Sequence, residues 1–301
     1  MRALVTGGAG FIGSHLVDAL LADGADVHVV DNLASGSREN VSPEAELHKL
    51  DIRDEAIEEL AVRLRPEVVF HLAAQADVGT SVERPAFDAD VNVVGMVRVL
   101  EAGRAAGARV VFTSTGGAIY GECERPARED DEPEPFSPYA ASKLAGEGYL
   151  ATWNRLHGGR NSTCRLANVY GPRQRPTLEG GVVAIFLDRL RDGHKADVFG
   201  DGSQTRDFVF VGDVVSALLA AAGAPAGLYN VGSGVATSVV ELYRLCVQTA
   251  GIGSEPHFAP ERPGDLRHSV LDASLAARKL GWRAETPLAE GVARTWNSLC
   301  S

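Results

Sequence analysis

A glycine-rich segment near the N-terminus constrains the fold of this chain more than any other feature. Residues 2–31 read RALVTGGAGFIGSHLVDALLADGADVHVVD. An aliphatic run over residues 2–5 predicts a buried strand, apolar residues from Ile12 onward at helical spacing predict a helix that stops at residues 23–24, and residues 27–30 predict a second strand. Strand, helix and strand in this order form a βαβ unit.

The glycine spacing indicates what the unit binds. Gly7 permits a tight turn after the first strand, Gly10 lets the backbone approach a pyrophosphate, and Gly13 permits close packing of helix on sheet. Asp31 follows the second strand, where a carboxylate accepts both hydroxyls of an adenosine ribose and repels a 2′-phosphate. Gly-rich turns also occur without a ligand, but here the complete ordered unit favours a bound dinucleotide. The carboxylate of Asp31 favours NAD over NADP.

Strands and helices continue to alternate after Asp31. Strands are predicted at residues 46–50, 68–72 and 109–112, and helices at 55–64 and 90–106. This alternation predicts an α/β fold with a doubly wound parallel Rossmann sheet, whose ligands lie at the carboxyl ends of the strands. We expect the NAD-binding domain to comprise residues 1–166 with about 207–233, and a smaller α/β substrate lobe to comprise 167–206 and 234–301.

Composition limits the classes of binding partner and the cellular compartment that we expect. A formal net charge of −11 argues against nucleic acid and anionic membranes as partners. The four cysteines lack metal-ligand or disulfide-framework spacing, so we expect no metal site and a reducing compartment. The chain begins directly with a core strand, which leaves no room for a signal peptide, and the expected location is the cytoplasm.

A tyrosine and a lysine four residues apart form the second informative feature. Pro138 is a favourable first residue for a helix over residues 139–157, on which Tyr139 and Lys143 share one face. A tyrosine ordinarily ionises near pH ~10. A neighbouring ammonium and a nicotinamide cation would stabilise the phenolate and make a general base. The pair alone is more often a solvated surface pair; beside an NAD unit, the catalytic interpretation is favoured.

These features resemble a known family. The motifs that carry the resemblance are TGGAGFIG from Thr6, HLAA from His71, STGGAIYG from Ser114, YAASK from Tyr139, NVYGPRQ from Asn168, GDGSQTRDF from Gly200 and RPGDLRHS from Arg262. The chain is similar, over nearly its whole length, to the extended short-chain dehydrogenases/reductases of the NAD-dependent sugar-nucleotide epimerase and dehydratase family.

The resemblance implies roles for individual residues. The catalytic group would be Tyr139, Lys143 and Thr115, with Ser114 as the alternative hydroxyl because this loop is one residue longer than the family's SSSATVYG version. The implied cofactor contacts are Gly7, Gly10, Phe11, Ile12, Gly13, Asp31, Asn32, Asp51, Ile52, Leu72, Ala73, Ala74, Gln75, Asn92, Tyr139 and Lys143. The implied substrate contacts are Thr115, Gly116, Asn168, Arg175, Val182, Arg206, Arg262, Asp265 and Ser269.

The family's reactions share one opening step, in which the tyrosine removes the proton of a sugar C4 hydroxyl while hydride leaves C4 for NAD. A 4,6-dehydratase typically has Asp-Glu directly after the catalytic Thr, where this chain has Gly116 and Gly117. The loop also lacks the Glu associated with decarboxylation. The resemblance therefore implies 4-epimerisation of a UDP-hexose through a 4-keto intermediate.

The sugar and its nucleotide are less constrained. The glucose/galactose pair is expected, and the glucuronate/galacturonate pair follows if Arg175 meets a C6 carboxylate. Uridine rests on the resemblance alone, so thymidine and cytidine stay open.

Other activities also stay open: a 4,6-dehydratase, a dehydrogenase or reductase that releases NADH, or a catalytically silent NAD-binding sensor. The helices that begin near Asp90 and Tyr139 pair between subunits in relatives, which implies a homodimer.

Overall fold

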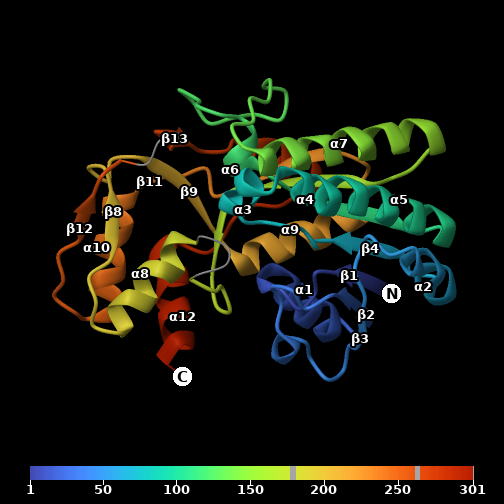
Figure 1. The fold of residues 1–301 in the computed structure, drawn as a ribbon, viewed down its shortest axis with the longest axis horizontal. Coiled ribbons are helices and arrows are strands. Elements are labelled where there is room, and N and C mark those ends of the chain that lie inside the picture. Colours follow the sequence, from blue (N-terminus) through green and yellow to red (C-terminus); the bar gives the residue numbers. More distant parts are fainter. Residues whose placement is uncertain (177–180, 262–264, 301) are drawn as a thin grey trace.

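Seven parallel strands form the centre of the molecule (Figure 1). The computed structural model describes residues 1–176, 181–261 and 265–300. The strand order is β10 (Leu228–Val231), β6 (Ser162–Leu166), β5 (Arg109–Thr115), β4 (Val68–His71), β1 (Arg2–Thr6), β2 (Asp26–Asp31) and β3 (Glu46–Lys49). The order reverses between β1 and β4, and such a switch point opens a crevice at the carboxyl ends of the strands. The predicted doubly wound α/β fold is confirmed.

Helices cover both faces of this sheet. One face carries α2 (Ala56–Leu64), α5 (Gly95–Ala106) and α7 (Pro138–His157), and the other carries α1 (Phe11–Ala22), α9 (Val211–Gly223) and α11 (Ser274–Leu280). Alternate residues of a strand point to opposite faces, so Leu4 packs in the core with Leu100 while Val5 packs in the core with Leu16. Both faces are therefore buried, as a parallel sheet requires.

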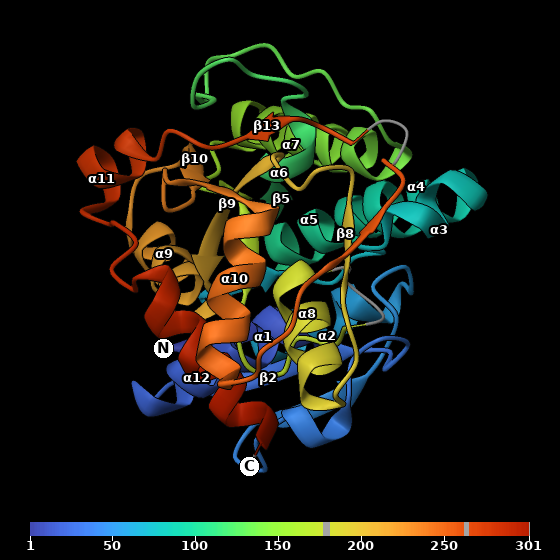
Figure 2. The ribbon, with the colours of Figure 1, turned by 90° about the vertical axis from the view of Figure 1, so that its left-hand side faces the viewer.

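A second group of elements lies beside the sheet, on the left in Figure 1 and facing the viewer in Figure 2. Its strands are β11 (Ala236–Ser238), β9 (Thr205–Phe210), β13 (His268–Ser269) and β7 (Asn168–Tyr170) in one sheet, and β8 (Asp197–Phe199) and β12 (His257–Ala259) in another. Its helices are α8 (Val182–Arg191), α10 (Val239–Ala250) and α12 (Leu288–Cys300). They enclose a separate apolar core that includes Phe186, Leu242 and Tyr243. The residue boundaries predicted for the two lobes stay a prediction.

Two local predictions are wrong in detail. Strand β5 continues to Thr115 instead of ending at Phe112, because Thr113, Ser114 and Thr115 pair with β6. The helix predicted over residues 90–106 begins with a π-helical turn, η2 (Asp90–Val94), before α5. Two short helices, α3 (Val78–Glu83) and α4 (Pro85–Ala89), precede it.

Among the described residues, none of the helices combines the length and the apolar character needed to cross a bilayer.

Replacement of Phe70 by Ala tests the central core. Phe70 lies on β4 and is fully buried. Truncation of a buried aromatic leaves a cavity, so Phe70→Ala should lower the free energy of unfolding by about 3–5 kcal/mol. Urea unfolding followed by circular dichroism measures the change. Val62→Ala, at a side chain on α2 that is 45% exposed, is the control and should change it by less than about 1 kcal/mol. Equal effects of the two substitutions would contradict the assignment of this core.

Candidate functional site

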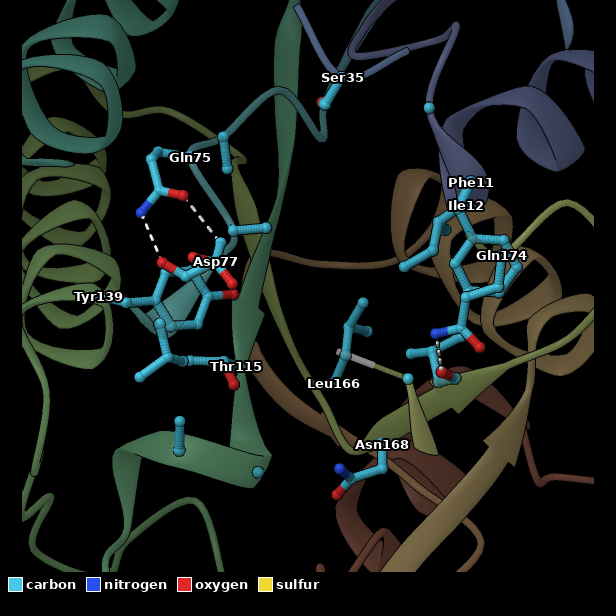
Figure 3. A pocket seen from close by; sticks show the side chains of 18 of the residues that line it. Phe11, Ile12, Ser35, Gln75, Asp77, Thr115, Tyr139, Leu166, Asn168 and Gln174 are labelled. Atoms are coloured by element: carbon cyan, nitrogen blue, oxygen red, sulfur yellow. Dashed lines mark hydrogen bonds between the residues drawn. The ribbon is translucent and has the colours of Figure 1, made fainter. Parts of the chain in front are cut away.

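A cavity of about 1070 Å³ lies at the carboxyl ends of the central strands (Figure 3). The Rossmann sheet and its helices contribute Gly7, Phe11, Asp31, Gln75, Thr115, Tyr139 and Lys143 to its wall. The second group of elements contributes Asn168, Gln174, Arg206, Phe208 and Asp265. Figure 3 shows Thr115 and Tyr139 on one side of the cavity and Asn168 toward the opposite wall. The cavity is thus shared between two structurally distinct sets of residues.

The glycine turn after β1 has no room for side chains. Gly7 has φ +74°, and a Cβ there would lie 2.6 Å from the backbone nitrogen of Ala73. A Cβ on Gly13 would overlap the carbonyl oxygen of Gly7. Helix α1 begins next to this turn at Phe11, and its N-cap Gly10 supplies no side-chain hydrogen bond. First-turn N–H groups of α1 are therefore left for an anionic ligand, as the pyrophosphate of a dinucleotide requires.

Asp31 occupies the end of β2, as predicted. Its buried carboxylate accepts hydrogen bonds from the backbone N–H groups of Ala9 (3.0 Å) and Leu33 (2.8 Å). The first bond ties Asp31 to the glycine turn, and the second holds Leu33 in a left-handed conformation at φ 61°. Each carboxylate oxygen has a second lone pair, so both can still accept a ribose hydroxyl.

Arg53 is a residue of this half of the cavity that the sequence did not predict. Its guanidinium donates to both carboxylate oxygens of Asp51 at 2.9 and 2.8 Å and to Asp90 at 2.7 Å. The hydrogen bonds from Arg53 hold the pKa of Asp51 well below its usual range. Asn32 also donates to Asp51, at 2.9 Å. Arg53 is thus held by two carboxylates at the cavity wall, and its position two residues after Asp51 was the only available signal.

Asn92 holds the loop after β4 through hydrogen bonds to the backbone of Gln75. Its side-chain oxygen accepts the Gln75 N–H at 2.8 Å and its amide donates to the Gln75 carbonyl at 2.9 Å. The amide also lies 3.1 Å from both Asp88 and Ser142. Asn92 sits in the π-helical turn and is buried. It acts on the cavity wall through Gln75 and does not line the cavity itself.

Tyr139 and Lys143 reach the cavity from the first turns of α7. The helix starts at Pro138, and the N-cap Ser137 accepts the Ala140 N–H at 3.2 Å. Lys143 is 4% exposed, with its Nζ 4.6 Å from the centre of the Phe112 ring. Burial lowers the pKa of Lys143 to about 8, against the opposing effect of the Glu147 and Asp88 carboxylates. A lysine so placed can exchange a proton near neutral pH.

The two candidate hydroxyls differ in accessibility. Ser114 and Thr115 are consecutive on β5, so their side chains leave opposite faces of the strand. Both line the cavity, but Ser114 is 3% exposed and its Oγ has no hydrogen-bond partner within the described part of the chain. Thr115 is partly exposed. The geometry makes Thr115 the hydroxyl that a ligand meets more readily.

The substrate side contains most of the predicted polar residues. Arg206 on β9 forms an ion pair with Asp265 and donates to the Leu266 carbonyl at 2.7 Å. Asn168 on β7 has a buried side-chain oxygen that no described residue satisfies. Val182 lines the cavity at the start of α8. Arg262 lies outside the described residues.

Three further predicted substrate residues do not line the cavity. Ser269 donates to the Gly117 carbonyl at 3.3 Å, so it supports the wall. A Cβ on Gly116 would lie 2.5 Å from Leu271, so Gly116 serves packing. Arg175 donates to the carbonyl of Ser35 at 3.3 Å, on the same half of the cavity as Asp31.

Gln174 is a second residue that the sequence did not single out. It belongs to the NVYGPRQ motif, donates to the Val169 carbonyl at 3.0 Å, and leaves its Oε1 without a partner in the described ranges. Phe208 of β9 also lines the cavity. Gln174 and Phe208 are far from the glycine turn in the sequence, and the fold places all three around one cavity.

The chain is similar to several known proteins. Residues 3–232 match the profile of the NAD dependent epimerase/dehydratase family. The chain is 52% identical to a UDP-glucose 4-epimerase of Mycolicibacterium smegmatis, with 98% of this chain and 97% of that protein covered. The structure of a Thermotoga maritima UDP-glucose 4-epimerase with UDP-glucose superposes with a TM-score of 0.97 at 45% identity, covering 100% and 99% of the two chains. A Thermus thermophilus UDP-glucose 4-epimerase in complex with NAD gives a TM-score of 0.95 at 44% identity, with the same coverage.

The proton affinity of Lys143 can be measured directly. An NMR titration of its side-chain resonances should give a midpoint near 8, because burial disfavours the ammonium. Asp88→Asn removes a negative charge that favours the ammonium and should move the midpoint lower. Glu44→Gln, at an exposed carboxylate outside the site, is the control and should leave it unchanged. A midpoint above 10 in the native protein would contradict this electrostatic description.

Proposed function

Because the chain belongs to the NAD dependent epimerase/dehydratase family, we propose that it is a UDP-hexose 4-epimerase that works with bound NAD. One observation carries the proposal. A single cavity joins the glycine turn and Asp31 to Tyr139 and Lys143, and continues to Arg206 and Asp265. A dinucleotide and a sugar nucleotide can therefore meet at Tyr139.

The cofactor half is suited to NAD. Gly7 and Gly13 leave no room for a Cβ, α1 offers its N-terminus to the pyrophosphate, and Asp31 can accept both ribose hydroxyls. A 2′-phosphate beside Asp31 would be repelled, so NADP is disfavoured. The nicotinamide supplies reversible hydride acceptance when it is bound.

Tyr139 performs the proton transfer in this proposal. Its phenolate takes the proton of the C4 hydroxyl as hydride leaves C4, and it returns the proton when the 4-keto sugar is reduced on its other face. The Lys143 ammonium stabilises the phenolate by its charge, and Thr115 donates a hydrogen bond to the same sugar oxygen. No net oxidation occurs, so the same NAD serves each turnover.

The residues after Thr115 favour epimerisation over dehydration. Elimination of water across C5 and C6 needs an acid beside the reacting sugar, and the two residues after Thr115 are Gly116 and Gly117. A Cβ at Gly116 would meet Leu271, and one at Gly117 would lie 3.2 Å from the side-chain oxygen of Asn168. The packing thus supports a site with no carboxylate at this position.

The neutral hexose pair is the favoured substrate. Arg206 suits a nucleotide diphosphate, because a guanidinium pairs with two phosphate oxygens at once, and Asp265 beside it suits a nucleotide ribose. Asn168 offers an unsatisfied amide oxygen that can accept a hydrogen bond from a sugar hydroxyl, and its amide N–H group can donate to the diphosphate. Arg175 donates to Ser35 on the cofactor half and does not line the cavity, so nothing there pairs it with a C6 carboxylate. We therefore place UDP-glucose and UDP-galactose ahead of the hexuronate pair.

The purified protein, without added cofactor, should convert UDP-glucose into UDP-galactose with no accumulation of free NADH. Chromatography resolves the two epimers. Parallel reactions with UDP-glucuronate and with dTDP-glucose show how much the rate of conversion depends on the sugar and on the nucleotide base. Net NADH formation would contradict the proposal and favour a dehydrogenase. Absence of any epimer, with NAD retained, would favour the catalytically silent binding protein.

Tyr139→Phe separates catalysis from binding. Loss of the phenolic oxygen should lower kcat by about 10²–10⁴-fold, because it removes the general base. Retention of NAD, measured by its release on denaturation, should be unchanged. Tyr149→Phe is the matched control on the same helix, with a side chain 45% exposed, and should keep full activity. Undiminished turnover in Tyr139→Phe would refute the catalytic role.

We further propose that two copies associate through α5 and α7. Val94 at the end of η2 and Tyr149 on α7 are 47% and 45% exposed, although both are large and apolar or aromatic. Helix α7 packs against η2 and α5, and Figure 1 shows α5 and α7 along one side of the molecule. Burial of such residues against a second copy would remove apolar surface from water.

Light scattering coupled to gel filtration tests this association. The native protein should elute at twice the chain mass of 31.8 kDa. Val94→Glu with Tyr149→Glu should shift it to a single chain mass, because each introduces a charge into the contact. The control Val62→Glu, at an exposed site on α2, should leave the dimer intact. A native protein that elutes as a monomer would remove the proposal.

A further inference from the structure

Three potential metal ligands meet on the strands at one edge of the sheet. His28 lies on β2, and Glu46 and His48 lie on the edge strand β3. The parallel register places His28 beside Glu46, and His48 follows two residues later on the same face of the strand. One ligand atom from each side chain lies within 4.8 Å of the others. These residues form the edge cluster, which lies outside the cavity described above.

The separations within the edge cluster bracket those of a coordination shell. His28 Nδ1 lies 3.1 Å from His48 Nε2 and 3.4 Å from a Glu46 carboxylate oxygen. The other Glu46 oxygen lies 3.8 Å from His48 Nε2. Ligands in a tetrahedral zinc site with bonds of about 2.0–2.2 Å lie roughly 3.3–3.6 Å apart. The two imidazole nitrogens share one hydrogen bond, so the ring that donates it must give up that proton before both nitrogens can ligate one ion.

A fourth side chain supports His28 from the opposite side of its ring. His28 Nε2 lies 3.5 Å from a carboxylate oxygen of Asp26, which is itself held by Arg2. Metal-binding histidines characteristically present their second ring nitrogen to a carboxylate, which fixes the tautomer and the ring orientation. With the proton on Nε2 facing Asp26, the Nδ1 lone pair of His28 faces Glu46 and His48. This contact is independent of the cluster distances.

We propose that His28, Glu46 and His48 bind one divalent transition-metal ion of the zinc class, with the remaining position open to water. Two imidazoles and a carboxylate are a ligand set that zinc accepts. His28 is 7% exposed, whereas the Glu46 side chain is 66% exposed, so an ion can enter from solvent past Glu46. Glu46 and Asp26 supply negative charge, and Arg63 on α2 is a nearby positive charge that opposes them.

The ion would act as a clamp at the sheet edge. Strand β3 pairs only with β2 in the seven-stranded sheet of the described residues. His28 precedes Asp31 by three residues on β2, so a bond between the strands also steadies the strand that presents Asp31. Metal binding should therefore raise the melting temperature, because an ion that binds the folded chain stabilises it.

Equilibrium dialysis of the full chain tests the site, with zinc chloride alone added after treatment with a chelator. We expect one zinc per chain and a rise of a few degrees in Tm. His48→Gln and Glu46→Gln should each weaken binding at least tenfold, and Asp26→Asn about tenfold through the orientation of His28. Glu46→Gln changes an exposed side chain, so loss of folding is not expected to obscure its result.

Two control variants identify where the zinc binds. Glu44→Gln alters a neighbouring exposed carboxylate outside the edge cluster, and Cys300→Ser removes an exposed thiol that could bind zinc adventitiously. Both should bind zinc as the native chain does. Binding that survives in both His48→Gln and Glu46→Gln, that disappears in Cys300→Ser, or that is absent from the native chain would overturn the proposal.

Discussion

The position of the reactive side chains depends on a buried ion pair between α7 and β6. Glu147 accepts hydrogen bonds from Arg165 at 2.9 and 2.7 Å, and both side chains are buried. Removal of either partner would leave an unpaired buried charge, which costs several kcal/mol, so the pair specifies how α7 lies on the sheet. Glu147 also follows Lys143 by one helical turn, and its charge favours the ammonium of Lys143. The Glu147 carboxylate thus both positions α7 and partly offsets the effect of burial, which lowers the pKa of Lys143.

A second buried carboxylate connects the substrate side to the sheet. Asp207 on β9 accepts hydrogen bonds from the backbone and hydroxyl of Ser233 and from the Gly234 N–H, in the loop after β10. Burial raises the pKa of Asp207, while these hydrogen bonds favour its charged form. Arg206 is the adjacent residue, so these contacts place the backbone that carries it, while Asp265 and the Leu266 carbonyl hold its guanidinium. The two halves of the cavity therefore have a defined relative position, to which Ile12 and Val169 add by packing against both apolar cores.

The sequence predicted best what depends on contacts within one short segment. The glycine turn, Asp31 and the Tyr139–Lys143 pair each follow from spacing inside a βαβ unit or a helix, and the alternation of elements predicts the sheet. Arg53 stands two residues after Asp51, but its second partner Asp90 comes from a distant segment, and Gln174 reaches the cavity through the fold, so spacing alone did not assign either residue. The edge cluster requires the register of β2 on β3, since a shift by one residue would place His48 on the other face. The extension of β5 to Thr115 likewise depends on pairing with β6.

Packing also limits which chemistry this scaffold can acquire. Gly116 follows the reactive hydroxyl, but its missing side chain would point at Leu271, which an isolated bridge with Ala127 holds in place. Gly117 approaches Asn168 so closely that even a methyl group would be crowded. A side chain at either position therefore requires the Leu271 or the Asn168 side chain to move. Dehydration and epimerisation share their first step, and in this chain the absence of the acid agrees with the packing of Leu271 and Asn168 against the loop.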